Sequence, residues 1–312
     1  MGSRGGQGAV VTAHRDVRWY AVTHITDYHY SAPVTSSYGR GHLFPRTTAA
    51  QRCLDATVTV SPAPTDASSG TDVHGNETVF FHVTTPHEHL RVTARSLVAV
   101  RAPDPTQLTT GSAVEPWEDA RPAGRADAAV DVEFALDLEP PEITDDVREY
   151  AAESLRPRRP LAEAVFDLQR RIHRDFTYRS GSTTTTTTVA HVMATRTGVC
   201  QDFARVAAAC LRSHGLAARY VSGYLSTTPP PGKERMVGVD ASHAWVSVRT
   251  SDGRWLDVDP TNDQWCDERY VTVAVGRDYD DVPPLRGIIY TDSARSRIQV
   301  SVDVAPVLPT VR

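Results

Sequence analysis

The sequence is poor in cysteine and contains no long apolar run. Its four cysteines, Cys53, Cys200, Cys210 and Cys266, are scattered and form no C-x-x-C pair. Scattered cysteines indicate free thiols in a reducing compartment, and so a cytoplasmic protein, although a single disulfide stays open. Because no stretch of about 18 apolar residues occurs, we expect no membrane-spanning helix.

The chain also has fewer basic than acidic residues. The 312 residues include 33 Lys and Arg against 38 Asp and Glu, a formal net charge of −5, and Lys233 is the single lysine. With a pI near 6.2 the chain lacks the basic character typical of nucleic-acid binding, so we expect no nucleic-acid partner. Residues 1–16 begin Gly-rich and lack the apolar centre of a signal peptide, which predicts a disordered tail.

What is present divides into two patterns. Residues 17–100 contain runs of aromatic and β-branched residues, the first ending at Pro33, which predict a β-rich, sandwich-like domain. Residues 101–140 are rich in Pro, Ala, Asp and Glu and indicate a linker or a long surface connection. In residues 141–312 helical periodicity comes first and strand alternation follows, ending with RIQVSVDVAP. We therefore predict an α+β fold with helices packed on an antiparallel sheet.

The clearest helical segment spans Thr197–Gly215 and has an unusual beginning. Apolar residues recur along it at three- and four-residue spacing, which gives one buried face, and its final glycine lies where a helix ends. Cys200 falls in the first turn, within the stretch GVCQD. The positive end of the helix dipole favours a thiolate there, and Asp202 would complement the same dipole.

Two downstream strands carry groups that could act with Cys200. In SHAWVSV and RWLDVDP, apolar residues alternate with His243 and with Asp257 and Asp259. Since side chains alternate between the faces of a strand, His243 and both aspartates share one face if the apolar sets share the core. Direct pairing of His243 with Asp259 requires a loop at residues 249–253, whereas a tight Asp-Gly turn would put them out of phase.

These three residues suggest nucleophilic catalysis at an amide. Cys200 would attack the carbonyl carbon, His243 would move the proton to the leaving amine, and Asp259 would hold the ring. The backbone N–H of Cys200, free at a helix start, could donate to the oxyanion. Tyr178 and Trp245 are candidates for the second oxyanion donor, between which the sequence does not decide.

The motifs also resemble a known family. GVCQDFA, DASHAWVSV and WLDVDPTN resemble, in this order, the core of the transglutaminase-like superfamily in its bacterial and archaeal, cysteine-protease-like branch. THITDYHYSAPV and DVHGNETVFFHV resemble the β-rich N-terminal region that accompanies this core. The resemblance implies a papain-like core with Cys200 as nucleophile, His243 as base and Asp259, not Asp257, as the orienting carboxylate. It shows no counterpart of the animal enzymes' calcium sites, so we expect no metal and no cofactor.

Other residues have plainer interpretations. Cys53, Cys210 and Cys266 are expected to be ordinary, because cysteine is most often buried, although Cys266 could line the cleft. Asn262 could take the orienting role in place of Asp259.

Histidines and loops leave further alternatives. A metal site could be imagined at His82, His87 and His89, but strand histidines without a cysteine partner are the simpler interpretation. Thr183–Thr188 predict a flexible loop that could gate the cleft. The Pro-rich residues 228–240 are either a lid or an ordinary surface loop.

The predicted activity is a cysteine-dependent reaction at an amide bond through a thioester. Water as the acceptor would make the protein a peptidase or amidase, which we expect, whereas an amine would make it a protein-glutamine gamma-glutamyltransferase. A binding or assembly module with an unused site, and acyl transfer from a thioester cofactor, are further alternatives. The expected partner is a peptide or protein substrate.

Overall fold

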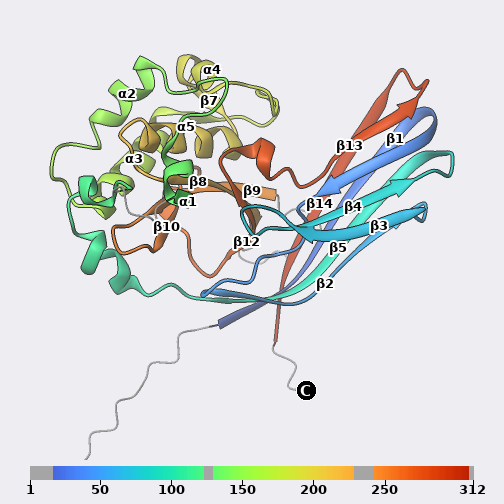
Figure 1. The fold of residues 1–312 in the computed structure, drawn as a ribbon, viewed down its shortest axis with the longest axis horizontal. Coiled ribbons are helices and arrows are strands. Elements are labelled where there is room, and N and C mark those ends of the chain that lie inside the picture. The colour runs from blue at the N-terminus through green and yellow to red at the C-terminus, as the bar shows by residue number, and fades with distance from the viewer. Residues whose placement is uncertain (1–16, 123–128, 228–241, 309–312) are drawn as a thin grey trace, which may run out of the picture.

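The computed structural model describes residues 17–122, 129–227 and 242–308 (Figure 1). The predicted disordered tail and the Pro-rich loop at residues 228–240 lie outside these ranges. The α+β prediction is confirmed, because a helical layer packs on an antiparallel sheet and five strands of a larger β-sheet precede it in the chain. Figure 1 shows the helices gathered at one end of the molecule and the long strands at the other.

The core sheet has five strands in the order β11-β10-β9-β8-β12. They are β8 (Ala218–Leu225), β9 (Ser242–Arg249), β10 (Trp255–Asp259), β11 (Gln264–Trp265) and β12 (Tyr270–Gly276). The helices are α1 (Ala129–Ala135), α2 (Asp145–Ala152), α3 (Leu161–Asp175), α4 (Val189–Thr195) and α5 (Cys200–Arg212). Apolar side chains of α2–α5 and of one face of this sheet form the main core. Among these described helices, none has the length and apolar character that crossing a membrane needs.

A separate sheet of seven strands contains the predicted β-rich region. Its strands are β1 (Val17–Gly41), β2 (Gln51–Ser61), β3 (Asp66–Thr71), β4 (Glu77–Val83), β5 (His87–Arg101), β13 (Arg286–Thr291) and β14 (Ser296–Val307). The layering differs from the predicted sandwich, since these strands belong to one sheet and not to two facing ones. We call this sheet the N-terminal sheet.

The long strand β1 organises the N-terminal sheet. Its first half pairs with both β5 and β14, and its second half with both β4 and β13, so each pair occupies opposite edges of β1. β4 is therefore continuous in direction with β5, and β13 with β14. The sequence prediction that the first strand ends at Pro33 is wrong: β1 passes the proline across a register shift between His29 and Val34, which accommodates the missing ladder donor.

The C-terminal strands correct the predicted extent of the core. The sequence assigned residues 141–312 to one unit, yet β13 and β14 pair with β1 in the N-terminal sheet. Alternation correctly predicts a strand in RIQVSVDVAP, but alternation does not identify the partner, and Val304 lies opposite Val22 from the other end of the chain. The core is thus inserted between two parts of the N-terminal sheet.

Residues 101–140 are more than a surface connection. They contain the short 3-10 helices η1 (Pro105–Leu108), η2 (Gly111–Ala113) and η3 (Trp117–Ala120), and then α1; a further one, η4 (Tyr279–Asp281), follows β12. Trp117 is buried in the main core, and its indole N–H donates to the carbonyl of Arg156 at 2.8 Å. Phe134 on α1 packs edge-on against Trp255, with ring centroids 5.7 Å apart. The described parts of this segment therefore belong to the core.

Two side-chain amides join the N-terminal sheet to β12, the outer strand of the core sheet. Gln51 donates to the carbonyl of Thr272 at 2.7 Å and accepts its backbone N–H at 2.8 Å. Asn76 does the same with Val275, at 2.8 Å in both directions. Each amide thus makes the pair of hydrogen bonds that the backbone of a further strand would make.

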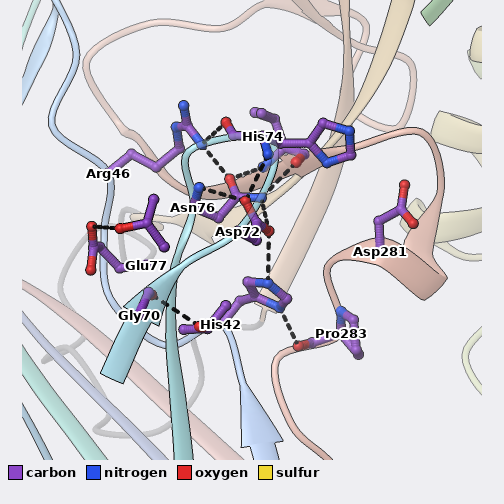
Figure 2. A network of polar contacts seen from close by, with 12 residues as sticks. His42, Arg46, Gly70, Asp72, His74, Asn76, Glu77, Asp281 and Pro283 are labelled. Atoms are coloured by element: carbon purple, nitrogen blue, oxygen red, sulfur yellow. Dashed lines mark hydrogen bonds and ion pairs between the residues drawn. The ribbon is translucent and has the colours of Figure 1, made fainter. Parts of the chain in front are cut away.

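Figure 2 shows how the turn carrying Asn76 is held. The Asp72 carboxylate accepts the backbone N–H groups of His74 and Asn76, at 2.9 and 2.8 Å, and the Asn76 side-chain amide at 2.8 Å. His42 Nε2 lies 3.2 Å from the same carboxylate, and Arg46 donates to the carbonyl of His74 at 3.0 Å. The motif DVHGNE therefore fixes the orientation of the amide that binds β12.

Candidate active site

Cys200 is the first residue of α5 and follows β7 (Thr197–Gly198) after one residue. Asp202 Oδ2 accepts the backbone N–H of Val199 at 2.8 Å and so caps the start of the helix. A Cβ atom on Gly198 would come within 2.8 Å of the Asp202 Cβ, so the glycine leaves room for the capping carboxylate. Gly198 and Asp202, which flank Cys200 in the sequence, thus fix its position at the helix tip.

The threonine loop is fastened to the same turn. The Thr183 hydroxyl donates to Asp202 Oδ2 at 2.6 Å, and the Gln201 side-chain amide donates to the carbonyl of Thr184 at 3.2 Å. The Arg205 guanidinium donates to a further carbonyl of the loop, that of Thr187. The sequence predicted a flexible loop, whereas these contacts hold it beside the turn that carries Cys200.

β9 and β10 present their side chains in the predicted phase. Val246 and Val258 pair across the two strands and face the helices, so the intervening positions occupy the other face. The detail of the prediction is wrong, however, because the loop covers residues 250–254 and the register continues with Asp259 opposite Trp245. His243 and Asp259 therefore meet diagonally across the strands, which the same-face argument still allows.

His243 lies between the other two predicted residues. Its Nε2 is 2.7 Å from Asp259 Oδ2, and its side chain is 9% exposed. Burial lowers the pKa of His243, but hydrogen bonds to Asp259 and Cys200 together raise it to about 10. With Nε2 used by Asp259, Nδ1 is the ring nitrogen available to Cys200. The structure thus brings Cys200, His243 and Asp259 into one chain of contacts.

Asp259 is fully buried, and both of its oxygens are hydrogen-bonded. Oδ1 accepts the backbone N–H groups of Thr261 and Asn262, at 2.8 and 3.3 Å. Oδ2 accepts the Asn262 side-chain amide at 2.7 Å in addition to His243. Burial raises the pKa of Asp259, yet the hydrogen bond and charge of His243 and these further donors bring it below its usual value. Asn262, considered as a replacement for Asp259, instead supports it.

Sequence reasoning missed Tyr270, which completes this shell. Its hydroxyl donates to Asp259 Oδ2 at 2.7 Å and accepts a hydrogen bond from Gln264. Tyr270 lies on β12, and its ring packs edge-on against Trp245 at 5.2 Å. No motif near Tyr270 marks this role, because the contact depends on the tertiary arrangement of two non-adjacent strands.

The two candidates for a second oxyanion donor differ in position. Trp245 is fully buried in a cluster with Val221 and Tyr270, and its ring lies over Gly223. Tyr178 is 55% exposed on β6 (Thr177–Tyr178), which pairs with β7 directly before Cys200. Burial, and secondly the charge of Cys200, raise the pKa of Tyr178. Tyr178 is therefore the better placed of the two.

The remaining cysteines are free thiols in other surroundings. Cys210 is fully buried within the main core, and burial raises its pKa to about 12. Burial likewise raises the pKa of Cys266 well above its usual value. The backbone N–H of Cys266 donates to the backbone carbonyl of Asp257 at 3.0 Å. Cys53 lies on β2 in the N-terminal sheet.

The three strand histidines have separate partners. His82 bonds the Ser36 hydroxyl at 2.8 Å, His87 a backbone carbonyl at 2.7 Å, and His89 a carboxylate of β1 at 2.8 Å. Over residues 17–122, 129–227 and 242–308, no group of three or more His, Cys, Asp or Glu side chains is arranged to hold a metal ion.

Family models and relatives agree with this architecture. The bacterial transglutaminase-like N-terminal region matches residues 20–99, and the transglutaminase-like superfamily matches residues 148–260. An uncharacterised protein of Mycobacterium tuberculosis is 60% identical over 291 residues, which cover 92% of each chain. Another, from Mycobacterium leprae, is 31% identical over 299 residues, covering 91% of this chain and 97% of that one. A protein-glutamine gamma-glutamyltransferase of Pseudomonas aeruginosa is 32% identical over 122 residues, 38% of this chain and 17% of that one.

A solved structure shares the whole fold. A candidate cysteine protease from Cytophaga hutchinsonii matches with a TM-score of 0.71 and 18% identity, covering 95% of this chain and 93% of that one. From these matches together, the chain belongs to the transglutaminase-like superfamily, a family generally made up of cysteine-dependent enzymes.

Proposed function

We propose that the protein hydrolyses amide bonds with Cys200 as the nucleophile, as a peptidase or amidase acting on a peptide or protein. The observation that carries this proposal is the chain of contacts from Cys200 through His243 to Asp259, with His243 Nε2 at 2.7 Å from the carboxylate. A pKa of about 10 keeps His243 protonated near neutral pH, so the ring beside the sulfur carries the proton that the leaving nitrogen needs.

Each step of this hydrolysis can be assigned to a residue of the site. The Cys200 thiolate attacks the amide carbon, and the backbone N–H of Cys200 donates to the oxyanion. His243 gives its proton to the leaving nitrogen as the C–N bond breaks, which leaves a thioester and a neutral imidazole. The imidazole takes a proton from water, the resulting hydroxide adds to the thioester, and the acid departs as the thiolate re-forms. Asp259 holds the ring throughout and stabilises its positive charge.

Transfer to an amine is the second candidate. The similarity to the Pseudomonas aeruginosa protein-glutamine gamma-glutamyltransferase, over 122 residues of this chain, favours it. The same thioester would form from a glutamine side chain with release of ammonia, and a primary amine would replace water as the acceptor. The two reactions share every group described above and differ only in the acceptor.

Product analysis separates the two reactions. A glutamine-containing peptide library is incubated with the protein and a labelled primary amine, and the products are followed by mass spectrometry. We expect new carboxylates from hydrolysis, which are lost in Cys200→Ala and retained in Cys53→Ser, a matched change in the N-terminal sheet. Incorporation of the labelled amine with little free acid would replace hydrolysis by transfer.

Thiol labelling tests whether the site is active at all. A binding module with an unused site would give Cys200 no special reactivity. We expect iodoacetamide at neutral pH to modify Cys200 fastest, with Cys210 and Cys266 much slower, because Cys210 is buried, Cys266 is partly buried and both have raised pKa values. Equal labelling of Cys200 and Cys53 would contradict the proposed enzyme.

A further inference from the structure

A second polar site lies on the core sheet, remote from Cys200. It is a cavity of about 330 Å³ between the turn at Val73, helix α1 and strands β8–β10. Arg219, Arg249 and Trp255 line it, with Asp131 and Phe134 of α1 opposite. We call it the arginine cavity. Its volume lies at the lower end of the range of small-molecule sites, about 300–1,000 Å³.

Arg219 is the unusual residue of the arginine cavity. Its Nε is buried without a hydrogen-bond partner, and no hydrogen bond or ion pair of its guanidinium occurs in the described part of the chain. The guanidinium instead stacks on the Trp255 ring, 4.1 Å from the centroid. Burial lowers the pKa of Arg219 to about 10, which reflects the loss of water around the charge.

Neighbouring carboxylates do not supply the missing partner. Asp131 is engaged by Arg249, with Nε and Oδ2 3.1 Å apart. Asp257 is separated from Arg219 by a whole strand, because Arg219 pairs with Ser247 and Ser247 pairs with Asp257. At about 4.8 Å between strands their backbones are roughly 10 Å apart, and the Asp257 carboxylate accepts the Ser247 hydroxyl. The lining therefore has one cation without a contacting anion.

We infer that the arginine cavity binds a small organic monocarboxylate, which pairs with Arg219 through its carboxylate and packs its apolar part against Trp255, Phe134 and Val73. A guanidinium presents a fixed fork of N–H donors that matches a carboxylate, and stacking on an indole leaves the edge of this fork free. The Arg249–Asp131 pair is neutral as a unit, and the charge of Asp257 acts on Arg219 without contacting it, so the guanidinium donors of Arg219 stay available to one carboxylate. The aromatic and aliphatic lining favours an organic anion over inorganic phosphate.

This site is independent of the proposed chemistry at Cys200. Arg249 is the last residue of β9 and His243 is the second, so the two lie about 20 Å apart at roughly 3.3 Å per residue. The cavity also lies where the N-terminal sheet, α1 and the core sheet meet, since Val73 belongs to the turn that holds Asn76 against β12. A bound carboxylate would consequently stabilise this junction by mass action.

Calorimetric titration of the full chain tests the inference. Benzoate is the probe, benzamide is its neutral isostere, and inorganic phosphate represents the other source of an anion. We expect saturable benzoate binding in the millimolar range or tighter, with a matching rise in melting temperature, and no saturation with benzamide. Arg219→Gln should weaken benzoate binding about tenfold or more, whereas Arg95→Gln, an exposed change on β5, should leave it unchanged.

Several outcomes would overturn the inference. Equal binding of benzoate and benzamide would show an apolar cavity without an anion site, and this comparison uses only the unmodified protein. Phosphate binding tighter than benzoate binding would contradict the carboxylate class. Unchanged benzoate affinity in Arg219→Gln would place the anion elsewhere. None of these readouts depends on turnover, so they are separate from the test of Cys200.

Discussion

Asp259 and Arg219 are buried charges on one face of the core sheet, and their surroundings are opposite. Asp259 accepts hydrogen bonds on both oxygens from His243, Asn262, Tyr270 and two backbone N–H groups. Arg219 makes none within the residues that the structure describes, and its guanidinium lies over the Trp255 ring. Burying a charge costs free energy unless the charge is paired and hydrogen-bonded. Asp259 meets this condition and Arg219 does not.

This difference in hydrogen bonding suits Asp259 to an orienting role in the reaction and leaves Arg219 available to a ligand. A saturated carboxylate keeps one position and one protonation state, which is what an orienting residue requires. An unsaturated guanidinium keeps its donors for a partner that the chain itself does not supply. Changes at Asp259 should therefore be much more damaging than changes at Arg219, to both turnover and stability.

The largest expected effect is that of Asp259→Asn. Replacing the carboxylate by an amide removes the charge that stabilises the His243 imidazolium and disturbs its tautomer, so kcat should fall about 10³–10⁴-fold. The measurement is turnover on the best substrate found for the wild type, with circular dichroism to verify the fold. Asp55→Asn, an exposed change on β2, is the matched control. Turnover near the wild-type value would remove Asp259 from the proposed mechanism.

A smaller loss is expected from Tyr270→Phe. The change removes one hydrogen bond to Asp259 and keeps the ring that packs on Trp245. Because a hydrogen bond to a charged group contributes about 1.5–3 kcal/mol, kcat should fall about 10- to 100-fold, with KM unchanged. Tyr30→Phe, in the N-terminal sheet, serves as the control. An increase in KM alone would mean that Tyr270 contacts substrate and does not position Asp259.

The comparison extends to stability in Arg219→Met. No hydrogen bond is lost, and a costly buried charge is replaced by an apolar side chain, so the free energy of unfolding should change by no more than about 1 kcal/mol or should increase. In the same urea titration, Asp259→Ala should cost about 3 kcal/mol or more, because His243 loses its partner. A similar loss of unfolding free energy in Arg219→Met and Asp259→Ala would contradict the proposed difference between the two sites.

A further expected effect is a pH dependence that His243 adds to stability. Its pKa is raised from 6.5 to about 10 in the folded protein, so folding favours the protonated form. The stabilisation should be complete below pH 6.5, decrease as the pH rises, and be gone above about pH 10. Urea unfolding of the wild type and His243→Gln at several pH values measures it. A difference that grows with pH would mean that the folded protein favours the neutral ring.

Local signals in the sequence predicted the parts of the site that are set locally. Gly198, Cys200 and Asp202 lie within one turn, so their spacing alone places the sulfur at a helix start. Alternation in β9 and β10 likewise gave the shared face of His243 and Asp259. Neither pattern contains information on register, which is why Asp259 was expected opposite His243 and instead continues opposite Trp245.

Contacts between distant segments were beyond local patterns. β14 has a clear alternation, but its pairing with β1 depends on the whole topology, and the core was therefore predicted to extend too far. Tyr270 and the amides of Gln51 and Asn76 were missed for the same reason, because their partners lie on strands that the sequence does not show to be neighbours. Arg219 carried no signal at all, since an arginine in a strand is usually solvated.

The amides of Gln51 and Asn76 have a consequence for any attempt to isolate the core. Without them, the outward backbone groups of Thr272 and Val275 on β12 would be left as an open strand edge. Open edges of this kind pair with other chains and lead to aggregation. By covering this edge, the N-terminal sheet prevents self-association of the core. A fragment that retains Cys200, His243 and Asp259 but lacks this sheet should therefore precipitate before it could be assayed.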